Sequence, residues 1–318
     1  MAGRCSTTAA TCSKREAARA SRPRAGHHAR RPPQVTLLAV PNLSEGRDAA
    51  AIEAIAAAFD ARLLDVHADR DHHRSVFTLA GEQGELAQYV LNGAREAIER
   101  IDLRQHRGEH PRVGALDVAP IVHLRHPDRG AACAEALVLA DLLGQQLELP
   151  VFLYGQLAAG RTRAELRRGG PEALAHRLRE GELNPDFGPE KLHPTGGAVL
   201  VGARPPLIAF NLELAAPATL EQARQVAAAI REGGAEGLGG VRAIGLWLER
   251  RGVTQVSTNV EDHHATSLAD VVKAVARHAR VAETELVGLA PRAAFAGFPE
   301  DLPIRNMRTI EDALGSES

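Results

Sequence analysis

From residue 35 onward, short apolar runs that suit β-strands alternate with segments whose apolar residues recur at helical spacing. Within residues 207–289 the order is strand, helix, strand, strand, helix, strand. This βαββαβ order is that of a ferredoxin-like unit. It constrains the architecture more than any single motif does, and it predicts an α/β (α+β) fold.

Local signals support this order in the second half of the chain. Thr219-Leu-Glu-Gln222 has the pattern of a capping box, so a helix is expected to follow Thr219. A second helix is expected to start at Thr266 or Ser267, with Asp270 in its first turn. Strands are expected at residues 207–214, 241–248, 253–258 and 285–289.

The first half resembles an enlarged version of the same plan. Asp48 is a plausible N-cap for a helix that carries Ile52, Ile55 and Phe59 on one face. Further helices are expected at residues 86–101, 131–147 and 161–180, the last interrupted at 169–171. Strands are expected at residues 35–40, 63–66, 75–79, 118–124 and 151–154, with a polar loop between the second and third.

Composition divides the chain into four expected segments. Residues 1–33 are rich in Ala, Arg and Ser, and a disordered leader or an upstream start codon is favoured there over an organelle transit peptide. An N-terminal subdomain is expected at 34–183, a C-terminal subdomain at 184–296 and a tail at 297–318. The Gly/Pro-rich passage 184–202 is expected to separate the two halves.

Charge and cysteine content exclude several classes of protein. The formal net charge of -2 argues against a nucleic-acid binder or a membrane-surface protein. No apolar run approaches the roughly 20 residues of a transmembrane helix. The three cysteines form no metal-binding pattern, which favours a reducing compartment and predicts a cytoplasmic protein.

A first candidate site is the polar stretch His67-Ala-Asp-Arg-Asp-His-His-Arg74. Histidines and aspartates in quick succession are possible metal ligands, as in metal-dependent phosphoesterases. Adjacent ligands on an extended loop point in different directions, however, so a polar loop that faces a substrate is favoured and no metal is expected. Simple solvent exposure is the third interpretation.

A second candidate site is Gly108-Glu-His-Pro-Arg-Val-Gly114, which precedes the strand expected at 118–124. His110 has an acid, Glu109, and a base, Arg112, beside it in a constrained turn, a setting that suits general acid–base chemistry. Asp117 is placed to orient an imidazole if the chain folds back. The alternative is a turn whose charges face water.

A third candidate site is the Gly/Pro-rich passage 184–202 together with the next residues up to Arg204. Glycines at this density let backbone N–H groups approach a ligand closely, and Phe187 is suited to stacking on a flat ring. Arg204 is suited to pairing with a carboxylate. The passage lacks a Walker or dinucleotide-binding pattern, and an ordinary linker is the alternative.

Together these segments resemble the formiminotransferase domain family over roughly residues 35–292. The matching pieces are Val40–Gly46, Asp71–Thr78, Gly108–Asp117, Val151–Gly155, Pro185–Pro189, Ala203–Arg204 with Ile208–Asn211, and Gln255–Asn259. They occur in the order and at the spacing of that family.

The resemblance implies two ferredoxin-like α/β-sandwich subdomains with a ligand groove between them, in a homodimer. It implies transfer of a formimino group from N-formimino-L-glutamate to tetrahydrofolate, with release of glutamate and no metal. His110 becomes the expected catalytic acid/base, with Glu109, Asp69 and Asp117 as possible accessory residues. The expected substrate and folate contacts are Arg74, Arg112, Arg204 and the run Gly188, Pro189, Glu190, Lys191, Leu192, His193, Pro194, Thr195, Gly196 and Gly197.

Two departures from the family pattern and several alternatives accompany this expectation. Gly196 stands where many relatives have Trp, which predicts a lost aromatic plate, and His67 stands where some have Asp, a role that Asp69 or Asp71 would then take. The chain lacks the helical cyclodeaminase domain of animal members, so transfer alone is expected. The alternatives are a 5-formyltetrahydrofolate–glutamate formyltransferase, a folate binder without catalysis, and a phosphoesterase using His67–His73.

Overall fold

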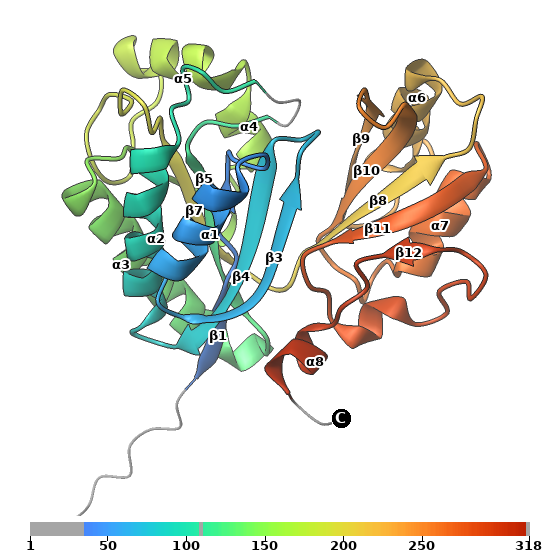
Figure 1. The fold of residues 1–318 in the computed structure, drawn as a ribbon, viewed down its shortest axis with the longest axis horizontal. Helices are drawn as coiled ribbons and strands as arrows, with labels where there is room; N and C mark the ends of the chain where they lie inside the picture. The colour runs from blue at the N-terminus through green and yellow to red at the C-terminus, as the bar shows by residue number, and fades with distance from the viewer. Residues whose placement is uncertain (1–34, 108–110, 316–318) are drawn as a thin grey trace, which may run out of the picture. The chain divides into compact units, whose positions relative to one another are not determined.

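The computed structural model describes residues 35–107 and 111–315. The first part of this chain, up to residue 204, forms a seven-stranded sheet (Figure 1). Six of its strands have the order β1-β4-β2-β5-β7-β6, and β3 pairs with β4. The strands are β1 (Thr36–Ala39), β2 (Asn42–Leu43), β3 (Arg62–Asp69), β4 (Arg74–Glu82), β5 (Leu116–His123), β6 (Val151–Leu153) and β7 (Val199–Arg204).

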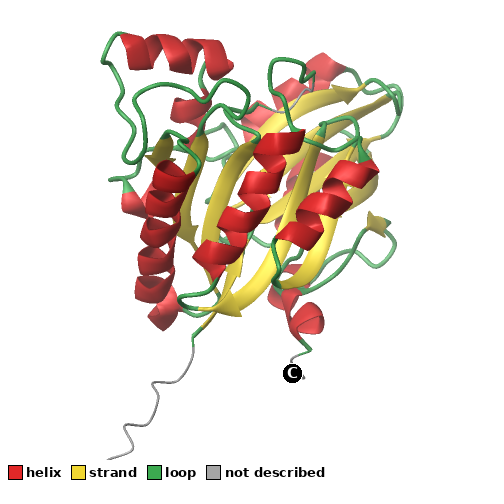
Figure 2. Ribbon diagram, turned by 60° about the vertical axis from the view of Figure 1, so that its left-hand side comes forward, coloured by secondary structure: helices red, strands yellow, loops and turns green. Residues whose placement is uncertain are grey.

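Helices cover both faces of this sheet. The helices α1 (Ala49–Ala58), α2 (Leu86–Arg100) and α3 (Arg129–Gln146) pack on one face (Figure 2). Their residues Ile55, Leu91 and Leu139 are fully buried against the strands. Two shorter helices, α4 (Arg163–Arg167) and α5 (Gly170–Arg179), pack on the other face of β5, β6 and β7 through Leu166 and Leu174. The short 3₁₀ turns are His126–Asp128, Gly155–Leu157 and Arg292–Phe295.

The second sheet has five strands in the order β12-β11-β8-β10-β9. Its strands are β8 (Ile208–Leu214), β9 (Val241–Leu248), β10 (Val253–Val260), β11 (Val281–Val287) and β12 (Ile304–Arg305). The helices α6 (Leu220–Ile230) and α7 (Leu268–Ala276) bury one face against Phe210, Leu212 and Val256. The expected βαββαβ unit is therefore confirmed, with its four main strands in the order fourth, first, third, second.

Most expected helices and strands are confirmed within a few residues. At the helix starts, the capping residues expected from the sequence form the hydrogen bonds that such residues make. The Asp48 side chain accepts a hydrogen bond from the Ala51 amide at the start of α1, and Ser267 and Asp270 form a complete capping box at α7. The polar loop expected after residue 66 is wrong in extent. β3 continues to Asp69 and β4 begins at Arg74, so the turn is only residues 70–73.

The expected division of the chain at residue 184 also needs revision. The strand β7 lies beyond that point, yet it pairs in parallel with β5 and β6 and completes the first sheet. The second sheet begins at Ile208. We therefore propose that the two subdomains meet at residues 205–207.

The end of the described chain returns to the first sheet. Helix α8 (Ile310–Leu314) places Ile310 in an apolar cluster with Leu38 and Leu64. Arg308 forms an ion pair with Asp65 on β3 and also donates to the Leu64 carbonyl at 3.0 Å. The residues expected to form a tail thus connect the C-terminal sheet to the edge hairpin of the first sheet.

Candidate functional site

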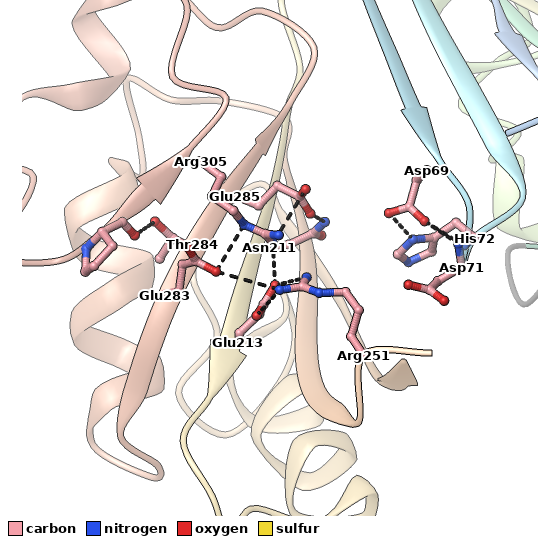
Figure 3. Close-up of polar contacts among 11 residues, drawn as sticks. Asp69, Asp71, His72, Asn211, Glu213, Arg251, Glu283, Thr284, Glu285 and Arg305 are labelled. Carbon is pink, nitrogen blue, oxygen red and sulfur yellow. Dashed lines mark hydrogen bonds and ion pairs between the residues drawn. The ribbon is translucent and has the colours of Figure 1, made fainter. Parts of the chain in front are cut away.

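The β3–β4 hairpin directs its neighbouring histidines to different places. The Asp69 carboxylate accepts hydrogen bonds from the Asp71 and His72 amides, both at 2.8 Å, and its second oxygen lies 2.8 Å from His72 Nδ1 (Figure 3). Burial opposes ionisation of Asp69, but the hydrogen bonds from His72 and Asp71 outweigh it, so its pKa lies below the usual range. Asp69 thus fixes the tip of the hairpin.

His73 turns instead toward the loop that follows β2. The Gly46 amide donates to His73 Nδ1 at 3.2 Å, and the His73 ring stacks on His106 with centroids 4.2 Å apart. Burial lowers the pKa of His73 and lowers that of His106 to about 4, so both rings are neutral at pH 7. Position 46 requires glycine, because a Cβ there would lie 2.1 Å from the Asp69 carbonyl oxygen.

Three arginines surround one buried carboxylate at the start of β5. Asp117, with a side chain only 3% exposed, forms an ion pair with Arg167 of α4 and accepts a hydrogen bond from the Val113 amide at 2.8 Å. Burial and the like charge of Arg167 together lower the pKa of Arg74 to about 9, although the Asp117 carboxylate opposes the shift. Burial likewise lowers the pKa of Arg112. The cluster gathers arginine side chains where water is scarce, and arginines in such a setting suit a carboxylate or phosphate ligand.

A small pocket joins these features. It is lined by Leu43, Ser44, His72, His73, Arg74, His106, Arg112 and Asp117. The structure therefore brings together three residues expected from the sequence, Arg74, Arg112 and Asp117. The Arg112 side chain is also fixed in position by a hydrogen bond, which its guanidinium donates to the His106 carbonyl at 3.1 Å.

The backbone after Arg112 is fixed by three different segments of the chain. Besides the Asp117 contact, the Ser44 hydroxyl donates to the Gly114 carbonyl at 2.7 Å, and the Ala115 amide donates to the Gly196 carbonyl at 2.9 Å. The Ala198 amide donates to the Val113 carbonyl at 2.9 Å. The last residues of the glycine-rich passage therefore reach the site, because they form backbone hydrogen bonds with the segment that carries Arg112.

The rest of the passage 188–197 lies away from the pocket lining. Gly188 adopts φ +78° and packs against Gly144 of α3 and the Leu149 carbonyl, while Glu190, Lys191 and Pro194 are exposed. Gly196 is buried, and a Cβ on it would face His193, Ile98 and Leu149 at 3.0–3.4 Å. Position 196 therefore faces packed interior and not the lining of this small pocket, and the expected loss of an aromatic plate stays a prediction.

The remaining expected residues are divided between other places. Arg204 lies at the carboxyl end of β7, whereas Gly197 precedes the opposite end of that strand. Glu109 and His110 lie outside the described residues. The sequence missed Ser44, His106 and Arg167, of which only Ser44 belongs to a segment that carried the family resemblance.

A second polar network on β8, β11 and β12 was also not expected from the sequence (Figure 3). Glu213 binds Arg251 and Arg305, and Arg305 Nε lies 3.1 Å from Glu283. The Asn211 amide donates to Glu285 at 3.1 Å. Burial lowers the pKa of His67, and the Glu285 carboxylate opposes this shift. A charged residue of the second sheet therefore acts electrostatically on a histidine of the β3–β4 hairpin.

Two searches of the described residues bear on metal and membrane binding. Across residues 35–107 and 111–315, no three histidine, cysteine, aspartate or glutamate side chains are grouped as a metal site. No helix in that same part of the chain combines the length and apolar character needed to cross a membrane.

Comparison with known families gives two adjoining matches. The profile of the formiminotransferase domain, N-terminal subdomain, matches residues 36–204, and that of the formiminotransferase domain matches residues 209–299. The two matches adjoin at the connection between β7 and β8.

Individual relatives agree with this result. A protein named glutamate formimidoyltransferase from Streptococcus pyogenes serotype M1 is 35% identical over 273 residues, which cover 82% of this chain and 91% of that protein. Its namesake from Thermoplasma acidophilum is 34% identical, over 80% of this chain and 88% of that protein. The formimidoyltransferase-cyclodeaminase of Rattus norvegicus is 40% identical over 79% of this chain and 49% of that protein. The chain spans about half the length of the mammalian relatives that it matches.

Proposed function

This chain belongs to the formiminotransferase family, and from that premise we propose that it moves the formimino group of N-formimino-L-glutamate to tetrahydrofolate and releases glutamate. The observation that carries the proposal is the group of Arg74, Arg112 and Arg167 beside the buried Asp117 carboxylate. Both substrates bear carboxylates, which arginine binds with charge-assisted hydrogen bonds.

The pocket is suited to binding and orientation. Burial of Arg74 and Arg112 leaves the site poorly hydrated, and a charge-assisted hydrogen bond to a substrate carboxylate is strong in such a site. The fixed backbone of residues 113–115 holds Arg112 in one place, which limits the entropy lost when substrate binds. The neutral rings of His73 and His106 form a wall that adds no competing charge.

The transfer needs a proton carrier. Attack by N5 of tetrahydrofolate on the formimino carbon forms a carbon–nitrogen bond, and the glutamate nitrogen must then leave as a protonated amine. One group that takes the N5 proton and returns a proton to the leaving nitrogen serves both steps. On the sequence resemblance we assign this role to His110, with Glu109 and Asp69 as accessory residues.

The deciding experiment incubates the purified protein with N-formimino-L-glutamate and tetrahydrofolate and measures glutamate release. Release that depends on both substrates supports the proposal, and no release despite tight folate binding would identify a binder without catalysis. Activity with 5-formyltetrahydrofolate and glutamate instead would identify the formyltransferase alternative. Loss of activity in EDTA would contradict the metal-free proposal.

A matched pair of variants tests the arginine cluster. We expect Arg112→Met to raise KM for the donor by about 10- to 100-fold, the effect of losing a hydrogen bond to a charged group. Arg104→Met removes an exposed arginine that pairs with nearby Asp102, and should change KM less than about twofold. Equal effects of the two substitutions would contradict the assignment.

The family also implies a cytoplasmic homodimer, which we include in the proposal. Light scattering coupled to gel filtration measures the assembly directly. A mass of one chain at micromolar concentration would exclude the dimer.

A further inference from the structure

A second basic cluster lies at the carboxyl ends of β6 and β7, apart from the pocket. We propose that Tyr154, Arg163 and Arg204 form a binding subsite for a carboxylate of a glutamyl group. This inference rests on the proposed function, because the donor and the tail of tetrahydrofolate both carry glutamyl carboxylates. Ligands commonly bind beyond the carboxyl ends of parallel strands, which is where these side chains lie.

The position of Tyr154 is set by a glycine. Tyr154 follows β6, is 6% exposed and has its ring against Gly202 of β7, where a Cβ would lie 2.7 Å from the ring. Burial of Arg204 lowers its pKa, and the Tyr154 oxygen opposes this shift by its charge and by a hydrogen bond between the two side chains. The Tyr154 hydroxyl is buried, and among the described residues no acceptor receives its proton.

Arg204 is also incompletely satisfied. Its Nη1 donates to the Pro205 carbonyl at 3.0 Å, whereas its buried Nε–H has no acceptor among residues 35–107 and 111–315. Burial lowers the pKa of Arg204 to about 10, which leaves it positively charged at pH 7. A hydroxyl and an N–H group, both buried and both without acceptors, call for a ligand that supplies acceptor atoms.

The charge of the cluster is positive. The Arg163 guanidinium lies 5.7 Å from the centre of the Tyr154 ring and 3.5 Å from the Glu261 carboxylate. Glu261 is shared with Arg242, 3.7 Å away, so it does not neutralise Arg163 and Arg204 together. A carboxylate has the charge and the two oxygens that these donors lack.

Helix α4 links this subsite to the pocket. Arg163 and Arg167 are four residues apart and so lie on the same side of the helix. Arg167 binds Asp117 at the pocket, and the charge of Arg163 lowers the pKa of both Arg74 and Arg204. The two clusters thus act on one another electrostatically, an arrangement that suits a ligand with more than one carboxylate.

The test compares conservative variants in steady-state kinetics. We expect Tyr154→Phe to raise KM for one substrate by about three- to tenfold and Arg163→Met by about 10- to 100-fold, with kcat changed less than about twofold. Arg242→Met is the control, since it also pairs with Glu261 but is exposed, and it should leave KM unchanged. No change in either KM for both variants, with normal turnover, overturns the subsite.

The substrate whose KM moves identifies the source of the carboxylate. A higher KM for N-formimino-L-glutamate assigns the subsite to the donor. A higher KM for tetrahydrofolate, with no such effect on tetrahydropteroate, which lacks the glutamyl tail, assigns it to the acceptor. Circular dichroism checks folding, and Arg163→Lys, which keeps the charge, should recover part of the loss.

A binding measurement separates this inference from the proposed function. Calorimetric titration with glutarate, a dicarboxylate, needs no turnover. Glutarate binding that Arg163→Met weakens at least about tenfold supports the subsite even if the wild-type protein transfers no formimino group. Transfer activity together with glutarate binding that is insensitive to Tyr154→Phe and Arg163→Met refutes the subsite alone.

Discussion

Replacing Asp117 by Asn tests how strongly the buried arginine cluster depends on this carboxylate. The amide keeps the shape and still accepts the hydrogen bond from the Val113 amide, but it leaves Arg167 without its counter-ion. The two side chains are 3% and 13% exposed. Breaking a buried pair on one side costs about 3–5 kcal/mol, because the remaining charge is neither hydrated nor compensated.

The first sheet contains a matched control. Asp186 also accepts a backbone hydrogen bond, from the Leu153 amide at 2.7 Å, and also binds an arginine, Arg161. Its pair is 30% and 25% exposed, so Asp186→Asn should cost only about 0–1 kcal/mol. The free energy of unfolding is measured from urea transitions followed by circular dichroism at pH 7. Losses that agree within about 0.5 kcal/mol would refute the argument from burial.

Three further predictions follow from the site. His110→Ala should lower kcat by about 10²–10⁴-fold while folate affinity, measured by calorimetry, is retained; unchanged kcat would contradict the assignment. The pKa of His106 is lowered to about 4, so between about pH 6.5 and 4 the unfolded chain binds a proton at this residue that the native state does not. The free energy of unfolding should therefore fall by at most about 3 kcal/mol as the pH decreases through this range. His106→Gln should remove that part of the pH dependence of urea unfolding. Gly196→Trp should reduce the melting temperature without improving folate affinity, because its side chain would meet Ile98 and Leu149; tighter folate binding would support an aromatic plate at this position.

The order of elements was predictable because it depends on local signals. Helix starts such as Asp48 and Ser267 are read directly from side chains that bond to the next turn. The place of β7 was not predictable in this way. Its Gly/Pro-rich approach looks like a linker, and only pairing with β5 and β6 shows that Val199–Arg204 belongs to the first sheet.

The site was predictable only where its residues belong to recognisable segments. Arg74, Arg112 and Asp117 were expected, and the structure brings them together. Arg167 gave no signal, because a charged residue on a short helix is usually solvated, and its role depends on α4 packing against β5. The direction in which a side chain at position 196 would point was likewise not predictable, because it depends on tertiary contacts with α2 and Leu149.

The return of the chain end to β3 has a consequence for the order in which the protein folds. Arg308 and Asp65 are 243 residues apart in sequence, and Arg62 donates to the Leu314 carbonyl across 252 residues. Domains generally fold in sequence as they leave the ribosome, and contacts this distant form late. The edge hairpin of the first sheet therefore gains these partners only after residues 308–314 have been synthesised, so a nascent chain stalled before Arg308 would expose Leu64 at a sheet edge.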